Sequence, residues 1–266
     1  MKTLAMIDAL WRYRGFVIGS VKRDYHQRYR RSALGALWTV LQPLATILIY
    51  ALVFSQLMRI RLPELDDTFS YSIYICTGII VWNLFASTSS RCVTVFVDNG
   101  DMLKKLSFPR ICLPITVVLS TLLDFFIITL IFFGFLLIIG RMPGWELVNL
   151  LVPLLLLVTF AASLGVLLGV LNVFFRDIGQ GFTMLLQFWF WLTPIVYPLA
   201  IVPERFAEAL AWNPMTGVLT AFQTVMVQHE PFAWGQLKGI VIATVITMAL
   251  AALVVSRSLD DMVDEL

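Results

Sequence analysis

The feature that most constrains this chain is a series of long apolar runs joined by short connections. The runs cover about 33–57, 70–92, 111–139, 147–171, 181–202 and 238–257. A helix needs about 20 such residues to cross the hydrocarbon core of a bilayer, and soluble domains rarely repeat runs of this length. Only 14% of the residues are charged, where about 25% is usual in a soluble domain. The sequence therefore predicts an all-α integral membrane protein, with six transmembrane helices in one domain over residues 33–257.

Lys and Arg are distributed unevenly around these runs. If the six runs alternate in direction, 14 of the 19 Lys and Arg residues lie on the side that holds both termini. Positive residues are enriched on the cytoplasmic side of membrane proteins. We therefore expect a multi-pass protein of the bacterial cell inner membrane, with a cytoplasmic N-terminal segment (residues 1–32) and a cytoplasmic tail (residues 258–266).

The basic N-terminal segment also contains apolar and aromatic residues. Between Asp8 and Arg31, residues such as Trp11 and Phe16 alternate with Lys and Arg. This composition is typical of an amphipathic helix that lies at the membrane interface. The alternative is that the basic residues only orient the first span. Residues 1–32 lack the apolar region of a cleavable signal, so we expect the first span to be an uncleaved anchor.

The connection after the second run is too long and too patterned for a simple turn. Asp98 or Asn99 can cap a helix, Lys104 and Lys105 favour its C-terminal end, and Pro109 stops it. These signals predict a short cytoplasmic helix over residues 98–108, parallel to the membrane. An inert interfacial loop is the alternative.

Two further segments predict specific packing. Residues 203–230 have intermediate polarity around Asn213 and are too short to cross twice, which predicts an outer re-entrant helical hairpin. Within the fourth run, Ala161, Gly165 and Gly169 recur every four residues. This spacing places three small residues on one helix face, where another helix can approach closely.

The chemistry of an enzyme is not evident in the sequence. It contains no Gly-Lys dipeptide and therefore no phosphate-binding loop, so if ATP drives this protein, another chain binds it. We find no catalytic set and no metal-ligand spacing. Asp124 is the one clear ionisable residue inside a run, and either relays protons or bonds to a neighbouring helix or to water.

Five short motifs resemble, in order and spacing, the membrane (permease) subunits of type 2 ABC exporters for polysaccharides, which include the O-antigen, capsule and teichoic acid permeases. The motifs are YRRSALGALW at 29–38 leading to Gln42-Pro43, NGDMLKKLSFPR at 99–110, FRDI at 175–178, TPIVY at 193–197 and NPM at 213–215. The resemblance covers nearly the whole chain. It implies a homodimer of this subunit bound to two copies of a separate cytoplasmic ABC ATPase, which binds the ATP and Mg. No cofactor of its own and no nucleic acid partner are expected.

The resemblance also implies residue roles and a substrate. The substrate would be a glycan linked to polyprenyl diphosphate, with O-antigen as the first candidate. The family's coupling helix, which inserts into the ATPase, would include Asp98, Asn99, Gly100, Asp101, Met102, Leu103, Lys104, Lys105, Leu106, Phe108, Pro109 and Arg110.

A hydroxyl-rich glycan with a charged head cannot cross hydrocarbon unaided, so a channel between two subunits is required. Aromatic faces suit the C–H surfaces of sugars, and the basic rim could meet the diphosphate through Arg28, Arg30 and Arg31. The predicted channel lining is Trp38, Tyr50, Phe188, Trp189, Trp191 and Tyr197. An interfacial aromatic belt is the alternative for the aromatic residues. The rival functions are a small-molecule or drug ABC exporter and a proton-coupled lipid-glycan flippase that depends on Asp124.

Overall fold

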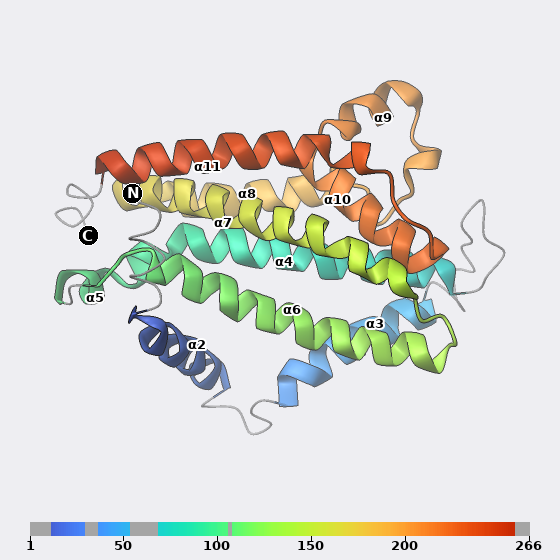
Figure 1. The fold of residues 1–266 in the computed structure, drawn as a ribbon, viewed down its shortest axis with the longest axis horizontal. Coiled ribbons are helices and arrows are strands. Elements are labelled where there is room, and N and C mark those ends of the chain that lie inside the picture. The colour runs from blue at the N-terminus through green and yellow to red at the C-terminus, as the bar shows by residue number, and fades with distance from the viewer. Residues whose placement is uncertain (1–11, 30–36, 54–68, 106–107, 259–266) are drawn as a thin grey trace.

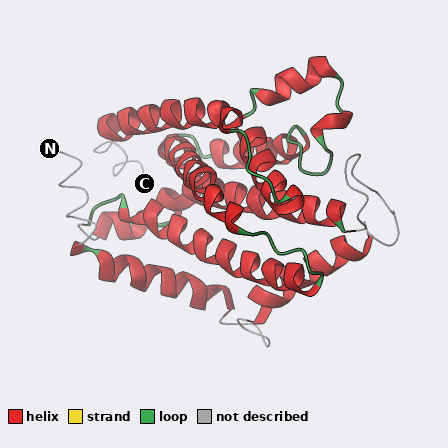
Figure 2. Cartoon of the chain, turned by 45° about the vertical axis from the view of Figure 1, so that its right-hand side comes forward, coloured by secondary structure: helices red, strands yellow, loops and turns green. Residues whose placement is uncertain are grey.

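The computed structural model describes residues 12–29, 37–53, 69–105 and 108–258, and these residues form helices joined by loops, without a strand among them (Figures 1 and 2). Four helical segments are long and apolar enough to cross a membrane. They are α4 (Ser70–Asp98), α6 (Cys112–Ile138), α7 (Leu151–Phe174) with the preceding 3-10 turn η3 (Trp145–Leu150), and α11 (Lys238–Ser258). At about 1.5 Å per residue, α6 is about 40 Å long, against a hydrocarbon core of about 30 Å. The prediction of an all-helical protein with membrane-spanning helices is thereby confirmed.

Two of the six predicted spans are shorter in the structure. Helix α3 (Trp38–Leu52) and helix α8 (Asp177–Trp191) have 15 residues each. A helix of this length extends about 22 Å, which is less than the hydrocarbon thickness. The first predicted span also includes residues 33–36 and 54–57, which lie outside the described residues. The count of six spans therefore stays a prediction.

Helix α4 is the central helix of the bundle. Twenty of its 29 residues are buried, and it packs against α6, α7, α8 and the short helix α10 (Pro214–Gln223). The contact with α7 depends on glycine: a Cβ added to Gly165 would lie 2.5 Å from Cys92 Cβ, and one added to Gly169 would lie 2.5 Å from the Cys92 carbonyl oxygen. The predicted close approach at the small-residue face is confirmed, because no larger side chain fits between these two helices.

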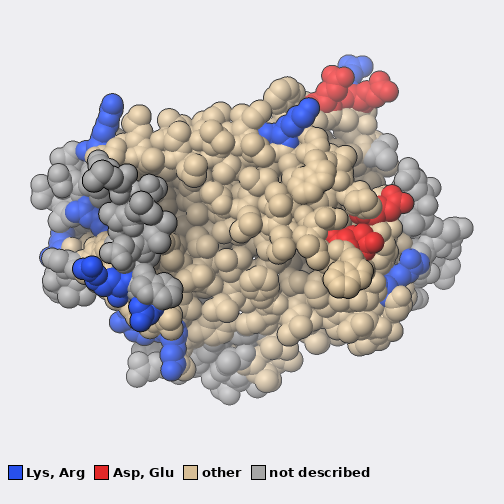
Figure 3. Space-filling model, in the orientation of Figure 1, with Lys and Arg blue, Asp and Glu red and all other residues tan. Residues whose placement is uncertain are grey.

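One end of the bundle carries most of the positive charge on the face in view. The C-terminal ends of α4 and α11 and the short helix α5 (Gly100–Lys105) lie at this end (Figure 1). Lys and Arg gather over it, whereas Asp and Glu gather near the opposite end (Figure 3). The second group comes from η3, from α9 (Glu204–Ala211) and from residues that follow η5 (Thr224–Gln228).

Two short helices follow α8 at the acidic end. Helix α9 has no buried residue, whereas α10 is largely buried between α4 and α11. Asn213 begins α10: its side-chain oxygen accepts a hydrogen bond from Met215 N–H at 3.1 Å, and Pro214 occupies the first turn, where no donor is required. A single π-helical turn, η5, then ends at His229, whose φ of 59° is left-handed. Residues 203–230 thus contain two short helices, α9 and α10, and the outer re-entrant hairpin stays a prediction.

Candidate functional site

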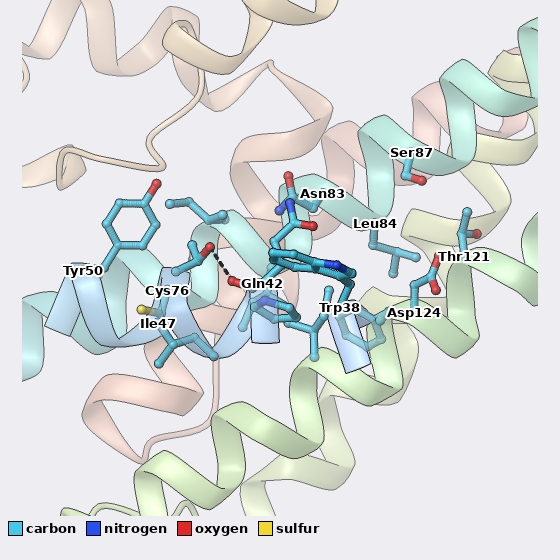
Figure 4. A pocket seen from close by; sticks show the side chains of 16 residues that line it. Trp38, Gln42, Ile47, Tyr50, Cys76, Asn83, Leu84, Ser87, Thr121 and Asp124 are labelled. Atoms are coloured by element: carbon cyan, nitrogen blue, oxygen red, sulfur yellow. Dashed lines mark hydrogen bonds between the residues drawn. The ribbon is translucent and has the colours of Figure 1, made fainter. Parts of the chain in front are cut away.

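A row of polar side chains crosses the apolar bundle on the side where α3, α4, α6 and α8 meet. Two hollows adjoin there. One, of about 280 Å³, lies between α3, α4 and α6 (Figure 4); the other, of about 600 Å³, lies between α4 and α8. We call them the α3–α6 groove and the α4–α8 groove. They share Asn83 and Ser87 of α4, so the two hollows are continuous along this helix.

The exposed or half-buried polar residues that line these two grooves form what we call the polar face. They come from four helices and comprise Gln42, Thr46, Asn83, Ser87, Ser90, Asp124, Thr183 and Gln187. Asn83 lies 13 residues after Ser70 and Asp124 lies 12 residues after Cys112, each about 20 Å from a helix end. The polar face therefore passes through the middle of the bundle's length.

Amide and carboxylate groups at this depth are not compatible with lipid. Hydrocarbon offers no hydrogen-bond partner, and each unsatisfied polar group costs several kcal/mol there. Intramembrane carboxylates accordingly face protein or a water-filled cavity. The polar face must therefore be covered by another protein surface or line an aqueous path.

Two other polar residues of α4, Thr88 and Ser89, make hydrogen bonds inside the helix bundle. Thr88 and Thr121 share a buried hydrogen bond of 2.8 Å between α4 and α6, and the Ser89 hydroxyl donates to the Phe85 carbonyl at 2.7 Å. Both Ser89 and Thr88 are fully buried. The polar stretch of α4 thus has two sides. Thr88 and Ser89 lie on the buried side, where Thr88 bonds to α6, whereas Asn83 and Ser87 line the grooves.

Three of the predicted channel aromatics lie at the grooves. Trp38 and Tyr50 line the α3–α6 groove, where Asp124 also lies (Figure 4), and Trp191 lines the α4–α8 groove. Trp38 is 46% exposed and Trp191 is 66% exposed. The structure therefore places Trp38, Tyr50 and Asp124 along one groove, with Tyr50 at the end away from Asp124 (Figure 4).

Trp189 is placed differently, inside an aromatic cluster within the subunit. Its ring packs edge-on against Trp82, Phe85 and Phe160, with centroid distances of 5.2 to 6.4 Å. Its indole N–H donates to the Asn213 side-chain oxygen at 3.0 Å. These contacts give Trp189 a packing role, which neither the channel nor the belt interpretation anticipated; a channel role for it stays a prediction.

The remaining two predicted aromatics are not in the lining of either groove. Phe188 is exposed on α8. Tyr197 lies in the turn after α8, where its hydroxyl donates to the Trp191 carbonyl at 3.1 Å. The carbonyl groups of this turn accept hydrogen bonds from α4: Tyr71 donates to Val196 O at 2.6 Å, and Tyr74 lies 3.0 Å from Tyr197 O.

The side chain of Asn213 makes further hydrogen bonds to this turn. Its amide nitrogen donates to the Leu192 carbonyl at 3.2 Å and to the Thr193 hydroxyl at 3.0 Å. Its side-chain oxygen accepts hydrogen bonds from the Trp189 indole N–H and from Met215 N–H at the start of α10. The Thr193–Tyr197 and Asn213–Met215 motifs are therefore joined by hydrogen bonds at the C-terminal end of α8.

The predicted coupling residues lie at the basic end of the bundle. Helix α5 covers Gly100–Lys105, and Asn99 separates it from α4: Asn99 donates to Val95 O at 2.8 Å, and its carbonyl accepts from Met102 and Leu103 N–H. The exposed members are Asp98, Asp101 and Lys104; Gly100 is buried, and the half-buried members are Asn99, Met102, Leu103, Phe108, Pro109 and Arg110. The Lys105 side chain and Leu106 lie outside the described residues.

Helix α2 (Arg14–Tyr29) connects the N-terminal segment to this end. It packs on α6, its Phe16 ring lies 4.9 Å from the Phe108 ring, and Asp24 forms a salt bridge of 2.6 Å with Arg91 of α4. Of the predicted diphosphate contacts, Arg30 and Arg31 lie outside the described residues. So does the side chain of Arg28.

The grooves also contain residues that the sequence did not single out as channel lining. Asn83, Ser87 and Ser90 were noted only as a polar stretch, and Thr183 and Gln187 were not noted at all. The spacing of Thr183 and Gln187, four residues apart beside Trp191, places all three on one side of α8 and could have indicated a polar helix face. Among the described residues, no group of three His, Cys, Asp or Glu side chains could hold a metal ion.

The sequence matches the ABC-2 type transporter family over residues 17–227. The O-antigen export system permease protein RfbA of Myxococcus xanthus is 32% identical over 229 residues, which are 85% of this chain and 86% of that protein. RfbA of Klebsiella pneumoniae is 29% identical over 207 residues, 76% of each chain. The polysialic acid transport protein KpsM of Escherichia coli is 27% identical over 203 residues, 74% of this chain and 75% of that protein.

Proposed function

Because this chain belongs to the ABC-2 type transporter family, we propose that it is the membrane subunit of an ATP-driven exporter that moves a lipid-linked polysaccharide out of the cell. The relatives named for O-antigen export and for polysialic acid transport support a glycan substrate, with O-antigen as the first candidate. The chain acts as a transport subunit and not as an enzyme.

The observation that carries the proposal is the polar face. A hydroxyl-rich glycan needs hydrogen-bonding groups along its path, and this subunit presents amides, hydroxyls and a carboxylate from four helices. One subunit leaves that face open on one side. A second copy of the chain, with the same face turned inward, would close a channel, as expected for a two-fold homodimer.

The energy source in this proposal is a separate ABC ATPase, present in two copies, that binds ATP and Mg. The sequence has no phosphate-binding loop. The exposed Asp98, Asp101 and Lys104 at the basic end are suitable contacts for that partner, and α2 flanks them through Phe16 and Asp24.

In this proposal the protein lies in the bacterial inner membrane with the basic end in the cytoplasm. The charge distribution supports that orientation. It has six spans, with α3 and the adjoining residues as the first and with α8 and the turn after it as the fifth. The α9–α10 pair is re-entrant from the outer side.

Deleting the gene in its bacterium tests the transport role. We expect the polysaccharide to disappear from the cell surface and lipid-linked glycan to accumulate inside, and we expect restoration only by the chain together with an active ATPase. Surface polysaccharide that persists without the chain would contradict the proposal.

A matched pair of variants tests the polar face. Thr183 and Thr159 are both exposed, and each hydroxyl donates to the carbonyl four residues earlier, but only Thr183 lines a groove. Thr183→Trp should block export by filling the α4–α8 groove, and Thr159→Trp on α7 should not. Equal export by the two variants would count against a path along the polar face.

A further inference from the structure

The α3–α6 groove combines an aromatic ring, two amides and one carboxylate. Trp38 and Gln42 of α3 face Asn83 of α4 and Asp124 of α6 across it (Figure 4). We infer that this groove is a sugar subsite that selects uncharged glycan units, and that Asp124 is the residue that discriminates against anionic ones. This inference rests on the proposed function and names the class of its substrate.

The chemistry of these side chains suits sugar hydroxyl groups. A carboxylate accepts hydrogen bonds from hydroxyls, and each amide both donates and accepts, as a neutral sugar requires. Hydrogen bonds of hydroxyls to a carboxylate are short and strong. The exposed face of Trp38 offers an apolar surface for the sugar ring.

The charge of the groove lining would favour neutral glycans over anionic ones. Among the described residues, the two grooves are lined by one carboxylate and by no Lys or Arg. Asp124 is half-buried in the middle of α6, about 18 Å from its start, where its carboxylate would repel an anionic sugar that enters the groove.

The repulsion between Asp124 and an acidic sugar would recur along the whole length of the polymer. A glycan with an acidic sugar in each repeat would bring a negative charge past Asp124 once per repeat. The diphosphate linkage passes only once per chain. The lining of the two grooves therefore suits repeating units whose only polar groups are hydroxyls and amides.

Two hosts that lack their own exporter provide the test. Both express this chain with its ATPase and assemble a hexose polymer on the same polyprenyl diphosphate carrier, and in one host each repeat also carries a uronic acid. Surface polymer is measured by labelling intact cells. We expect the wild-type protein to export the neutral polymer and to export the anionic one at least about tenfold less, a ratio that one like-charge contact at short range can produce.

Substitutions in the groove test whether Asp124 causes the difference in export between the two polymers. Asp124→Asn should raise the ratio of anionic to neutral export about tenfold, because the amide removes the negative charge from the groove. Asn83→Asp, which adds a second carboxylate, should lower anionic export further. Glu146→Gln removes a carboxylate outside both grooves and should change neither polymer.

The outcomes separate the inference from the proposed function. Equal export of both polymers by the wild-type protein, or parallel changes of both in Asp124→Asn, would overturn the subsite while leaving the export function in place. Export of neither polymer by the wild-type protein with its ATPase would overturn the proposed function, and the inference with it. Membrane levels and ATPase co-purification of each variant show that the subunit is folded.

Discussion

Trp189 and Trp191 lie two residues apart on α8 in different surroundings, and alanine substitutions should therefore have different effects at the two positions. Trp189 is packed among three aromatic rings and donates a hydrogen bond to Asn213. Trp191 is 66% exposed and lines the α4–α8 groove. We expect Trp189→Ala to destabilise the subunit, and Trp191→Ala to reduce export from a subunit of nearly normal stability.

The magnitude for Trp189 follows from its contacts. Each aromatic pair contributes about 0.5–1.5 kcal/mol and the hydrogen bond about 1 kcal/mol, so loss of three pairs and one bond costs roughly 3–5 kcal/mol. This agrees with the cost of about 3–5 kcal/mol for aromatic-to-alanine changes in protein cores. Among the described residues, the Trp191 ring packs against one other ring, that of Phe190 at 5.4 Å, so its removal should cost about 1 kcal/mol or less.

Heating the detergent-solubilised subunit and following the loss of monodisperse protein measures this difference. A loss of 3 kcal/mol lowers the midpoint by roughly 6–12 °C for a chain of this size. Trp189→Phe, which keeps the ring and loses the N–H donor, should lie between the wild type and Trp189→Ala. A smaller shift for Trp189→Ala than for Trp191→Ala would refute the packing argument, and full export by Trp191→Ala would refute its place in the channel.

Three further predictions concern other parts of the subunit. Gly169→Leu should prevent α7 from packing on α4, because a Cβ alone would already meet the Cys92 carbonyl oxygen, whereas Gly181→Leu, where nothing lies within 4 Å, should leave a folded subunit by size-exclusion chromatography. Lys104→Glu in α5 should reduce ATPase co-purification without unfolding the subunit, and the matched Lys238→Glu, at the start of α11, should not. Asn213→Ala should lower the thermal midpoint, because it removes a helix cap and the partner of the Trp189 N–H, together about 2–4 kcal/mol.

Each of these has a result that would contradict it. A folded Gly169→Leu subunit would show that α4 and α7 can separate without loss of the fold. Normal ATPase binding by Lys104→Glu would place the coupling contact elsewhere. An unchanged midpoint for Asn213→Ala, equal to that of Asn149→Ala, whose side chain makes no hydrogen bond in the described structure, would mean that the turn after α8 does not depend on Asn213.

Several elements could be predicted from local patterns. The apolar runs of α4, α6, α7 and α11 are long enough to identify membrane-crossing helices directly, because helix length and hydrocarbon thickness are both fixed by geometry. The small-residue face of α7 was predictable because a four-residue spacing returns to the same side of a helix. The helix break near Asn99 was predicted from capping chemistry.

Other features depended on packing between segments far apart in the chain. The sequence grouped Phe188, Trp189, Trp191 and Tyr197 together because they are close along the chain. On α8, however, Trp189 is half-buried and packs against aromatic rings of the core, whereas Trp191 lines the α4–α8 groove. Asp124 had no evident neighbours in the sequence. Its proximity to Trp38 and Asn83 arises only because α3, α4 and α6 meet.

The sequence by itself therefore determined that the chain is a helical membrane protein with a basic end, and its motifs indicated the transporter family. These properties are read from composition, run length and residue order, which need no partner helix. The tertiary structure alone decided which side chains of α3, α4, α6 and α8 share one polar face. The physical reason is that a helix turns by about 100° per residue, so neighbours in sequence diverge in space, and only the packing of helices determines which of their faces meet.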